Sequence, residues 1–186
     1  ASDVYKRQIY SDKKKRAQVD WTSIGEHSLQ NGLATFVVCK SLGLKSKAIS
    51  KALSKFNGVS RRMDLVGEKS GIKIYDDFAH HPTAIKFTLE GLRKKVGDAR
   101  IICLLEMRSN TMLSGYHDKK IPRAIQDADE VYVFSKDNEQ ISALENKSKK
   151  IKACSTTQEF LMKLGSINLE NTHLICLSNG SFDGIH

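Results

Sequence analysis

The sequence contains little proline, few aromatic residues and no long apolar run. Prolines account for two of the 186 residues, and aromatic residues for 7%. A membrane-spanning helix needs roughly 20 consecutive apolar residues, and no stretch of this chain comes near that length. The first residues, ASDVYKRQIYSDKKKRAQVD, also lack the apolar segment of a signal peptide. We therefore expect neither secretion nor a membrane partner.

Two further absences concern the start of the chain and nucleotide chemistry. The sequence has no initiator methionine, so we expect a piece that begins inside a longer protein. It also has no G-x-x-x-x-G-K-[ST] motif, the glycine-rich loop with which many enzymes hold a triphosphate. Any triphosphate site of the P-loop type must therefore lie outside these residues.

The four cysteines form no C-x-x-C pair and stand far apart in the sequence. Two of them, Cys103 and Cys176, lie inside apolar runs that are typical of strands. This pattern predicts buried free thiols in a reducing cytoplasm rather than a disulfide framework or a zinc site.

The chain is basic, with a formal net charge of +9. Much of the excess stands in lysine runs at residues 13–16 and 147–152, and aromatic residues are not interleaved with them. A nucleic-acid-binding module would need such a stacking platform together with its positive charge. We therefore favour a solvated basic face and expect no nucleic-acid partner.

The first part of the chain predicts a strand or loop followed by two amphipathic helices, at residues 27–41 and 45–56. Apolar residues recur at helical spacing in both segments. The turn-rich, basic stretch 57–62 then predicts a boundary between domains 1–57 and 58–186. The residues expected to point inward are Leu29, Leu33, Phe36, Val37, Ala48, Ile49, Ala52, Leu53 and Phe56.

The second part alternates strands with helices, which predicts an α/β fold with a mostly parallel sheet. It opens with a hairpin around Lys69–Gly71, followed by a helix that starts at Pro82, where a missing N–H costs little. The run ARIICLLE is continuously apolar, as expected of a strand covered on both faces. The remaining predicted elements are helix 82–96, strand 99–106, helix 118–127, strand 130–135, strand 149–155, helix 156–166 and strand 172–180.

Polar residues gather where the predicted strands end. In parallel α/β sheets ligands bind beyond the carboxyl ends of the strands, so this rim is the candidate functional site. The residues at these ends are Asp76, Asp77, Glu106, Arg108, Ser135, Asp137, Ser178 and Asn179.

The stretch YDDFAHHPTAI places two aspartates, two histidines and a proline within eleven residues. Three interpretations stay open from its chemistry alone. Asp77 could cap the helix that starts at Pro82, a carboxylate here could bind a nucleotide ribose, or Asp76, Asp77 and the two histidines could hold a metal.

Other polar groups have a functional and an ordinary interpretation. Paired arginines suit phosphate because guanidinium is a bidentate donor, but Arg61 and Arg62 also suit an exposed connector. His27 and Asn31 share one face of a helix and could flank a base, or simply face solvent. Residues 108–111 could supply donors to an anionic ligand or form a plain polar loop. Residues 178–186 resemble a strand-to-helix turn that could bind an anion.

Five motifs occur in an order that resembles the Mur ligases, the ATP-dependent amide-forming enzymes of bacterial peptidoglycan synthesis. The resemblance covers about residues 20–186. The motifs are G-x-H-x-x-x-N at Gly25–Asn31, G-x-x-R-R at Gly58–Arg62, D-D-F-A-H-H-P-T at Asp76–Thr83, R-S-N-T-M at Arg108–Met112 and S-N-G-x-F-x-G-I-H at Ser178–His186.

The resemblance implies the tail of a central ATP-binding domain, followed by most of a Rossmann-like C-terminal domain that is truncated at its end. The last two motifs narrow it to the cytoplasmic ligase of peptidoglycan recycling. That ligase joins UDP-N-acetylmuramate to the tripeptide L-Ala-γ-D-Glu-meso-diaminopimelate through an acyl phosphate. The implied cofactors are ATP and Mg²⁺, with Mg²⁺ ligands mainly upstream. The implied partners include the rest of the central domain and the N-terminal domain, and this piece alone is expected to be inactive.

Motif matching also implies roles for single residues. His27 and Asn31 would contact adenine, Arg62 the phosphates and Asp77 the ribose. His80 and His81 would join Asp77 as catalytic residues near the reacting groups, without a metal. The tripeptide carboxylates need cationic and amide donors, and the residues implied for them are Arg108, Ser109, Asn110 and Thr111.

Two alternatives belong to other readings of the same residues. One is the UDP-N-acetylmuramate–L-alanine ligase of the same family, which shares the D-D-x-x-H-H-P stretch. The other is a metal-dependent phosphoesterase built on Asp76, Asp77, His80 and His81.

Overall fold

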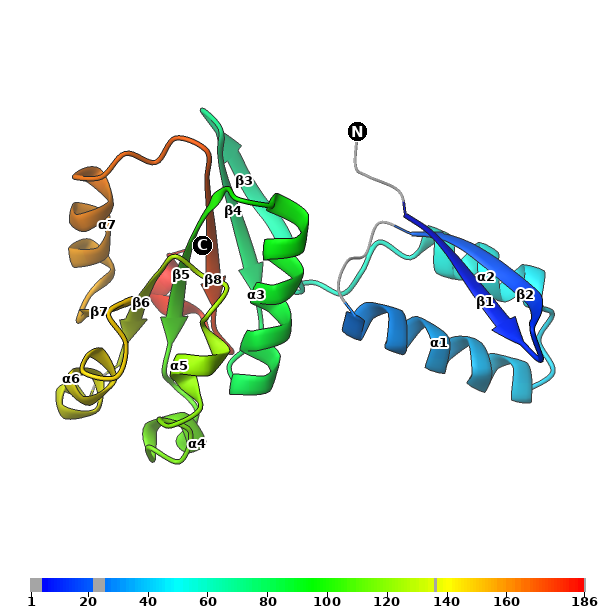
Figure 1. Ribbon diagram of the computed structural model, residues 1–186, viewed down its shortest axis with the longest axis horizontal. Helices are drawn as coiled ribbons and strands as arrows, with labels where there is room; N and C mark the ends of the chain where they lie inside the picture. Colours follow the sequence, from blue (N-terminus) through cyan, green and yellow to red (C-terminus); the bar gives the residue numbers. More distant parts are fainter. Residues whose placement is uncertain (1–4, 22–25, 136, 186) are drawn as a thin grey trace. The chain divides into compact units, whose positions relative to one another are not determined.

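The computed structural model describes residues 5–21, 26–135 and 137–185, and the chain forms two compact units. Unit 1 comprises Ala1–Val59 and unit 2 comprises Ser60–His186. Figure 1 shows unit 1 in blue and cyan, and unit 2 from green to red. Within the described residues, no helix combines the length and the apolar character that crossing a membrane requires.

Unit 1 consists of a hairpin and two helices. Strand β1 (Tyr5–Ser11) pairs antiparallel with β2 (Lys14–Trp21). The two turn residues, Asp12 and Lys13, have φ values of 51° and 60°, which fits the twist of a two-residue hairpin turn. Helix α1 (Glu26–Ser41) and helix α2 (Ser46–Lys55) follow, and Gly43, with φ of 86°, lies in the turn between them.

The core of unit 1 is small. Its buried apolar residues are Ala17, Val19, Trp21, Phe36, Ile49 and Leu53. Phe36, Ile49 and Leu53 were predicted to point inward, and they do. The prediction was wrong for Leu33, Val37 and Phe56, which are 50%, 57% and 45% exposed, and for Ala48 and Ala52, which are also exposed. The described residues of unit 1 bury only one side of each helix, and the apolar residues beside that side are exposed.

Unit 2 is built on a six-stranded sheet in the order β3-β4-β8-β5-β6-β7. Strand β3 (Asp64–Lys69) pairs antiparallel with β4 (Ile72–Asp77), and the remaining pairings are parallel. This confirms the predicted α/β fold with a mostly parallel sheet. The other strands are β5 (Arg100–Glu106), β6 (Glu130–Phe134), β7 (Ile151–Cys154) and β8 (Thr172–Leu177).

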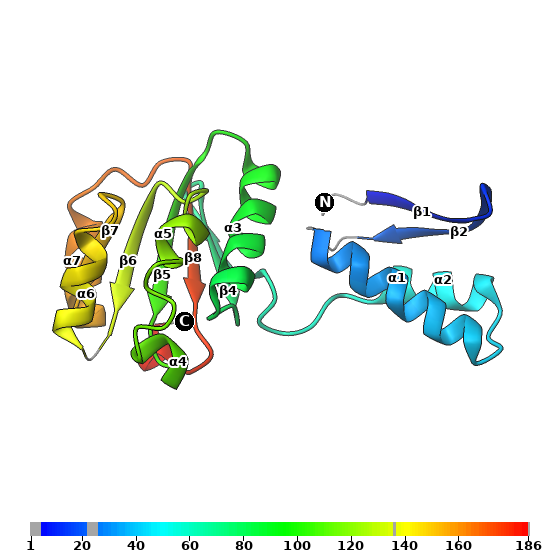
Figure 2. The same ribbon diagram turned by 60° about the horizontal axis from the view of Figure 1, so that its bottom comes forward.

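Helices cover both faces of this sheet (Figure 2). One face packs against α3 (Pro82–Val96), α5 (Ile121–Ala124) and α6 (Asn138–Glu145), in a core that contains Leu89, Ile121 and Leu144. The other face packs against α7 (Thr157–Gly165), with Phe160 and Leu164 at the centre. Because both faces are covered, β5 and β8 are apolar along almost their whole length, as expected of buried parallel strands.

Two predicted segments differ from the structure. Helix α5 is only four residues long, whereas a helix over 118–127 was predicted. Residues 110–113, predicted as loop, form the short helix α4 (Asn110–Leu113). The sequence analysis also missed α6, which has only a few apolar positions to signal helical periodicity. Its strongest signal is its N-cap, Asp137, which accepts hydrogen bonds from the backbone N–H groups of Glu139 and Gln140.

The four cysteines are free, as predicted. Cys103, Cys154 and Cys176 are buried, whereas Cys39 is partly exposed. Burial raises the pKa of Cys154 to about 11 and that of Cys176 to about 12. These three thiols therefore stay protonated at neutral pH and act as small apolar side chains.

Candidate functional site

The candidate site lies at the carboxyl ends of β4, β8 and β5, which are neighbours in the sheet. Asp77 and Leu105 both pair with Leu177 of the central strand β8. The next residue, Ser178, donates its backbone N–H to the carbonyl oxygen of Asp77 at 3.1 Å. The three strand ends therefore meet at one edge, where Figure 2 also shows α4. This is the rim that the sequence predicted.

A strained turn, Arg61–Met63, stands beside this rim. Arg61 and Met63 have φ values of 58° and 53°, a region that non-glycine residues adopt only at a cost of about 1–2 kcal/mol each. The two aspartates of the D-D motif hold the turn in place. The Arg61 Nε donates to Asp76 Oδ2 at 2.8 Å, and the Met63 backbone N–H donates to Asp77 Oδ2 at 2.9 Å.

Arg61 links three chain segments through hydrogen bonds, so its charge is already paired within the protein. Its Nη2 also donates to the carbonyl oxygen of Ser178 at 2.9 Å. Its backbone carbonyl accepts from the N–H of Phe78 at 2.8 Å. The Asp76 carboxylate beside it is buried. Solvent therefore screens the attraction between Arg61 and Asp76 less than it would at the surface.

Asp77 is buried and already hydrogen-bonded within the protein. The residue is only 3% exposed. Besides Met63, the carboxylate accepts from the backbone N–H of Ala79 at 2.8 Å and from the Thr88 hydroxyl at 3.4 Å. Burial raises the pKa of Asp77, although the two backbone donors and nearby Arg62 oppose the shift.

The capping interpretation of Asp77 is wrong. The N-cap of α3 is His81, whose Nδ1 accepts from the Thr83 backbone N–H at 3.4 Å. Asp77 instead stabilises the turn before β3 and the bend after β4. The reason is that residues 78–81 separate the end of β4 from the start of α3, so Asp77 lies too far before the helix to cap it.

Arg62 is the exposed cation of this rim. Its guanidinium lies 5.7 Å from the centre of the Phe78 ring, and Arg61 lies 5.6 Å from the same ring. Among the described residues Arg62 makes no ion pair, whereas Arg61 is paired with Asp76. An exposed guanidinium on an aromatic ring, with its donors available, suits a phosphate or a carboxylate.

The two histidines of the motif have different surroundings. His80 contacts the carbonyl oxygen of Phe78 through Nδ1 at 3.0 Å and lies edge-on to the Phe78 ring. His81 is exposed, and its ring meets the ring of His117 at 4.4 Å between centroids and an angle of 76°. His117 itself is 3% exposed, and its Nδ1 has no hydrogen-bond partner among the described residues.

The loop after β5 carries the predicted peptide-binding residues. Arg108, Asn110 and Thr111 are exposed, and Ser109 caps α4 by accepting from the Met112 backbone N–H at 3.4 Å. Arg108 packs closely over Gly180. A Cβ placed on Gly180 would lie 2.0 Å from Arg108 Nη1, so only glycine leaves room for this arginine.

The segment after β8 closes the rim through side chains rather than through a helix terminus. The Ser178 hydroxyl donates to Glu106 and accepts from the Gly180 backbone N–H. Residues Phe182–Gly184 form a single 3₁₀ turn, too short to provide the anion site expected of a helix N-terminus. The predicted strand-end residues Ser135 and Asp137 belong to the next loop along the sheet, where Asp137 caps α6.

A metal site is not formed by the described residues. No three histidine, cysteine, aspartate or glutamate side chains among them gather in a way that could hold an ion. The geometry explains this result, because Asp76 and Asp77 point to protein donors and His81 points to His117. The described residues therefore offer no ligand set for the phosphoesterase alternative.

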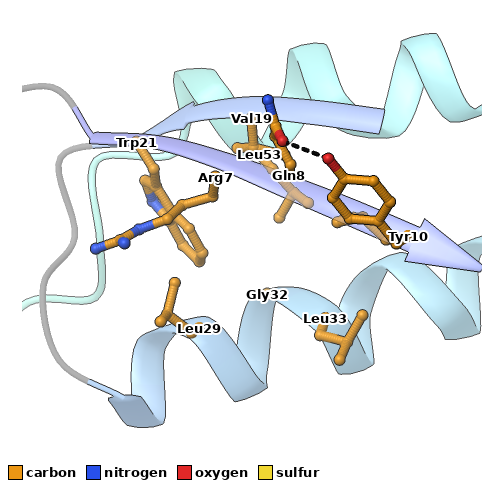
Figure 3. A pocket seen from close by; sticks show the side chains of 10 residues that line it. Arg7, Gln8, Tyr10, Val19, Trp21, Leu29, Gly32, Leu33 and Leu53 are labelled. Atoms are coloured by element: carbon orange, nitrogen blue, oxygen red, sulfur yellow. Dashed lines mark hydrogen bonds between the residues drawn. The ribbon is translucent and has the colours of Figure 1, made fainter. Parts of the chain in front are cut away.

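Unit 1 has a separate cavity of about 430 Å³ between the hairpin and α1 (Figure 3). Its labelled lining includes Trp21, Leu29 and Leu33, with Tyr10 donating to Gln8 Oε1 at 2.7 Å near one end. The lining is mainly apolar and, among the described residues, does not include Asn31. Asn31 is exposed on α1, whereas the His27 side chain lies outside the described set, as does Gly25.

One family of known proteins matches most of this chain. The family described as Mur ligase, glutamate ligase domain, matches residues 61–179, which carry every rim residue except the last part of the 178–186 motif. This chain belongs to the Mur ligase family. The resemblance noted in the sequence is thereby confirmed.

Individual Mur ligases resemble the chain over its whole length. It is 34% identical to the UDP-N-acetylmuramate–L-alanyl-γ-D-glutamyl-meso-2,6-diaminoheptandioate ligase of Escherichia coli K12, with 100% of this chain and 41% of that protein covered. The crystal structure of a murein peptide ligase from Psychrobacter arcticus 273-4 matches with a TM-score of 0.73 and 30% identity, over 100% of this chain and 41% of the other.

A UDP-N-acetylmuramate–L-alanine ligase from Caldicellulosiruptor bescii is 42% identical, but over 113 residues that cover 59% of this chain and 24% of that enzyme. The chain thus spans about two fifths, 41%, of the E. coli relative that it matches throughout.

Sequence reasoning missed three contributors to this Mur ligase rim. Phe78 stood inside the recognised motif, but only the structure shows that its exposed ring lies beside Arg61 and Arg62. His117 gave no signal, because its partner His81 is 36 residues away. Gln140 gave none either, because it lies on α6, which was not predicted.

Proposed function

We propose that the chain is the C-terminal part of a cytoplasmic ATP-dependent ligase that joins UDP-N-acetylmuramate to L-Ala-γ-D-Glu-meso-diaminopimelate in bacterial peptidoglycan recycling. The match to the E. coli ligase named for this peptide carries the proposal, because it extends over the whole chain. The match to the L-alanine ligase from C. bescii has higher identity but covers 59% of the chain. The L-alanine ligase is therefore the second candidate.

The proposal assigns residues 1–57 to the end of a central ATP-binding domain and residues 58–186 to the C-terminal domain. The chain contains no P-loop sequence, so the triphosphate site and the main Mg²⁺ ligands belong to the rest of the ligase. Alone, the chain is expected to turn over no ATP.

In the proposed reaction, ATP supplies the phosphoryl group that activates the muramate carboxylate. The amine of the peptide then attacks the acyl phosphate, and phosphate leaves as the amide bond forms. Arg62 fits a role at the transferred phosphate, because its guanidinium is exposed and forms no ion pair with a described acidic side chain. His80 and His81 are proposed to lie near the reacting groups, and His27 and Asn31 to contact adenine.

Asp77 is proposed to serve the nucleotide by positioning as well as by contact. Its carboxylate holds Met63 and thereby the strained turn that presents Arg62. A ribose hydroxyl could reach Asp77 only at an oxygen that already accepts protein hydrogen bonds. The geometry therefore supports an effect of Asp77 on Arg62 more directly than an effect on ribose.

The Arg108–Thr111 loop is proposed to bind the carboxylates of the tripeptide. Arg108 supplies an exposed guanidinium, and Asn110 and Thr111 add exposed polar groups beside it. Gly180 leaves space for the Arg108 side chain to lie against the backbone.

The test uses the intact ligase and compares the tripeptide with L-alanine as acceptor. We expect kcat/KM for the tripeptide to exceed that for L-alanine by at least about 100-fold, and Arg108→Ala to raise the tripeptide KM by about 10–100-fold. Arg123→Ala, an exposed arginine on α5, is the matched control and should leave both values unchanged. Preference for L-alanine would instead establish the second candidate.

A further inference from the structure

Met112 directly follows the Arg108–Thr111 loop and anchors it in the core. This residue is fully buried and belongs to the same core as Ile121 and Ile141. Its backbone N–H donates to the carbonyl oxygen of Ser109 at 2.9 Å. The orientation of the exposed residues just before it therefore depends on how the Met112 peptide group is held.

Gln140 holds Met112 on its carbonyl side, which belongs to the next peptide group. Its side-chain Nε2 donates to the Met112 carbonyl oxygen at 2.6 Å and to Asp118 Oδ1 at 3.1 Å. Both amide hydrogens are thus used, one at each end of the segment from residue 112 to residue 118. A neutral side chain with two donors on one nitrogen is needed for this pair of bonds.

Gln140 is itself held rigidly. It lies in the first turn of α6, whose N-cap Asp137 accepts from the Gln140 backbone N–H at 3.0 Å. The residue is 7% exposed, so water cannot readily replace its bonds. Its Oε1 is buried without a partner among the described residues. An unpaired buried acceptor is unfavourable, so a contribution to stability alone does not explain why Gln140 stands here.

We propose that Gln140 is a positioning residue for the Arg108–Thr111 loop and sets the affinity of the ligase for its peptide acceptor. The inference deepens the proposed function and rests on it, because it assumes that this loop binds the peptide. Gln140 is buried, so the role proposed for it is an indirect one. It acts by fixing Met112 and Asp118, the two ends of the segment that follows the loop.

Gln140→Glu in the intact ligase tests this role. The carboxylate keeps the shape but loses both donors, and it faces a carbonyl oxygen and the Asp118 carboxylate. We expect the tripeptide KM to rise about tenfold at pH 8, with the ATP KM and kcat changing less than twofold. Because burial near another acid raises the pKa of an introduced carboxyl, part of the loss should be recovered at pH 6, where the protonated group donates one hydrogen bond.

Two comparisons make the test specific. Gln140→Met fills the same volume without donors, so it should show a similar rise in KM at both pH values. Gln158→Glu, on the exposed surface of α7, should match the wild type at both. If Gln140→Glu does not fold, Gln140→Met alone still measures the effect on the tripeptide KM.

An unchanged tripeptide KM in folded Gln140→Glu or Gln140→Met ligase would overturn the inference. The result for Arg108→Ala separates this failure from a failure of the proposed function. If Arg108→Ala raises the tripeptide KM while the Gln140 variants do not, only the role of Gln140 is lost. If neither residue affects the tripeptide KM, the loop does not bind the peptide and both proposals fail.

Discussion

The two units of the chain differ in how completely they bury their own apolar residues. Unit 2 has a covered sheet with a core on each face. Among its described residues, unit 1 has a core of six buried apolar side chains, while Leu33, Val37 and Val38 on α1 are 50–57% exposed. A helix that is apolar on several sides is typical of the interior of a larger body. Regular helices and strands therefore do not by themselves give unit 1 a core as complete as that of unit 2.

Charge follows the same division. Residues 1–59 contain 11 lysines and arginines but only 4 aspartates and glutamates, whereas residues 60–186 contain 19 and 17. In unit 2 acidic partners are built into the structure, as where Glu130 binds both Arg100 and Lys152. Unit 1 has an excess of basic residues, so repulsion among them adds to the weakness of its small core.

The largest expected effect comes from separating the units between residues 59 and 60. We expect residues 60–186 alone to melt cooperatively, with a Tm within a few degrees of the whole chain. Residues 1–59 alone should lack a cooperative transition, because fewer than about 70 residues seldom bury enough apolar surface. Circular dichroism melts measure both. A sharp melt of the isolated 1–59 peptide would show that its small core suffices.

A smaller effect is expected from adding one methyl group to a glycine of each unit. In Gly32→Ala the new Cβ would lie 2.4 Å from Trp21 Cζ3, and the rigid ring cannot yield without moving α1. We expect a loss of about 1–3 kcal/mol in unit 1. Trp21 is the chain's single tryptophan, so its fluorescence reports on unit 1 directly.

The matched substitution in unit 2 is Gly180→Ala, where the flexible end of Arg108 can swing away. We expect its Tm to change by less than about 2 °C, and Gly165→Ala, with open space around its Cβ position, to serve as the neutral control. Equal destabilisation by Gly32→Ala and Gly180→Ala would mean that Arg108 is as firmly fixed as the Trp21 ring.

The smallest expected effect is a pH dependence within unit 2. Burial lowers the pKa of His117, and neighbouring His81 and Lys120 lower it further, against a weaker opposing effect of Asp118. The unfolded chain then binds the proton more tightly than the folded chain. Stability is therefore full above the ordinary histidine pKa of about 6.5 and falls as the pH decreases below it.

His117→Phe keeps a ring against His81 but removes this titration. Between pH 7.5 and 5.5 we expect the Tm of the wild type to fall by about 2 °C more than that of the variant. The measurement is a pair of thermal melts on residues 60–186 or on the whole chain. Parallel curves for the two proteins would contradict the assignment of the pH dependence to His117.

Much of the fold of unit 2 could be predicted because its signals are local. The helix Pro82–Val96 was predicted with its observed bounds, since Pro82 marks its start and Gly97 follows its end. The rim was also predictable, because the ends of parallel strands meet at one edge. The inward faces of the unit 1 helices were predicted less well, since apolar spacing shows which residues could be buried but not whether a partner covers them.

The sequence by itself determined the alternation of strands and helices, the order of five motifs and therefore the family. Only the tertiary structure decided what the polar residues of those motifs do. It showed that Asp77 supports a strained turn rather than capping a helix, and that Arg61 is ion-paired whereas Arg62 is exposed. It also brought Gln140 into contact with Met112, next to the Arg108 loop. Each decision depends on partners far apart in the chain, such as Arg61 and Ser178, which are 117 residues apart. Helix and strand signals arise from neighbours in sequence, whereas a hydrogen bond of this kind exists only once the sheet has brought its ends together.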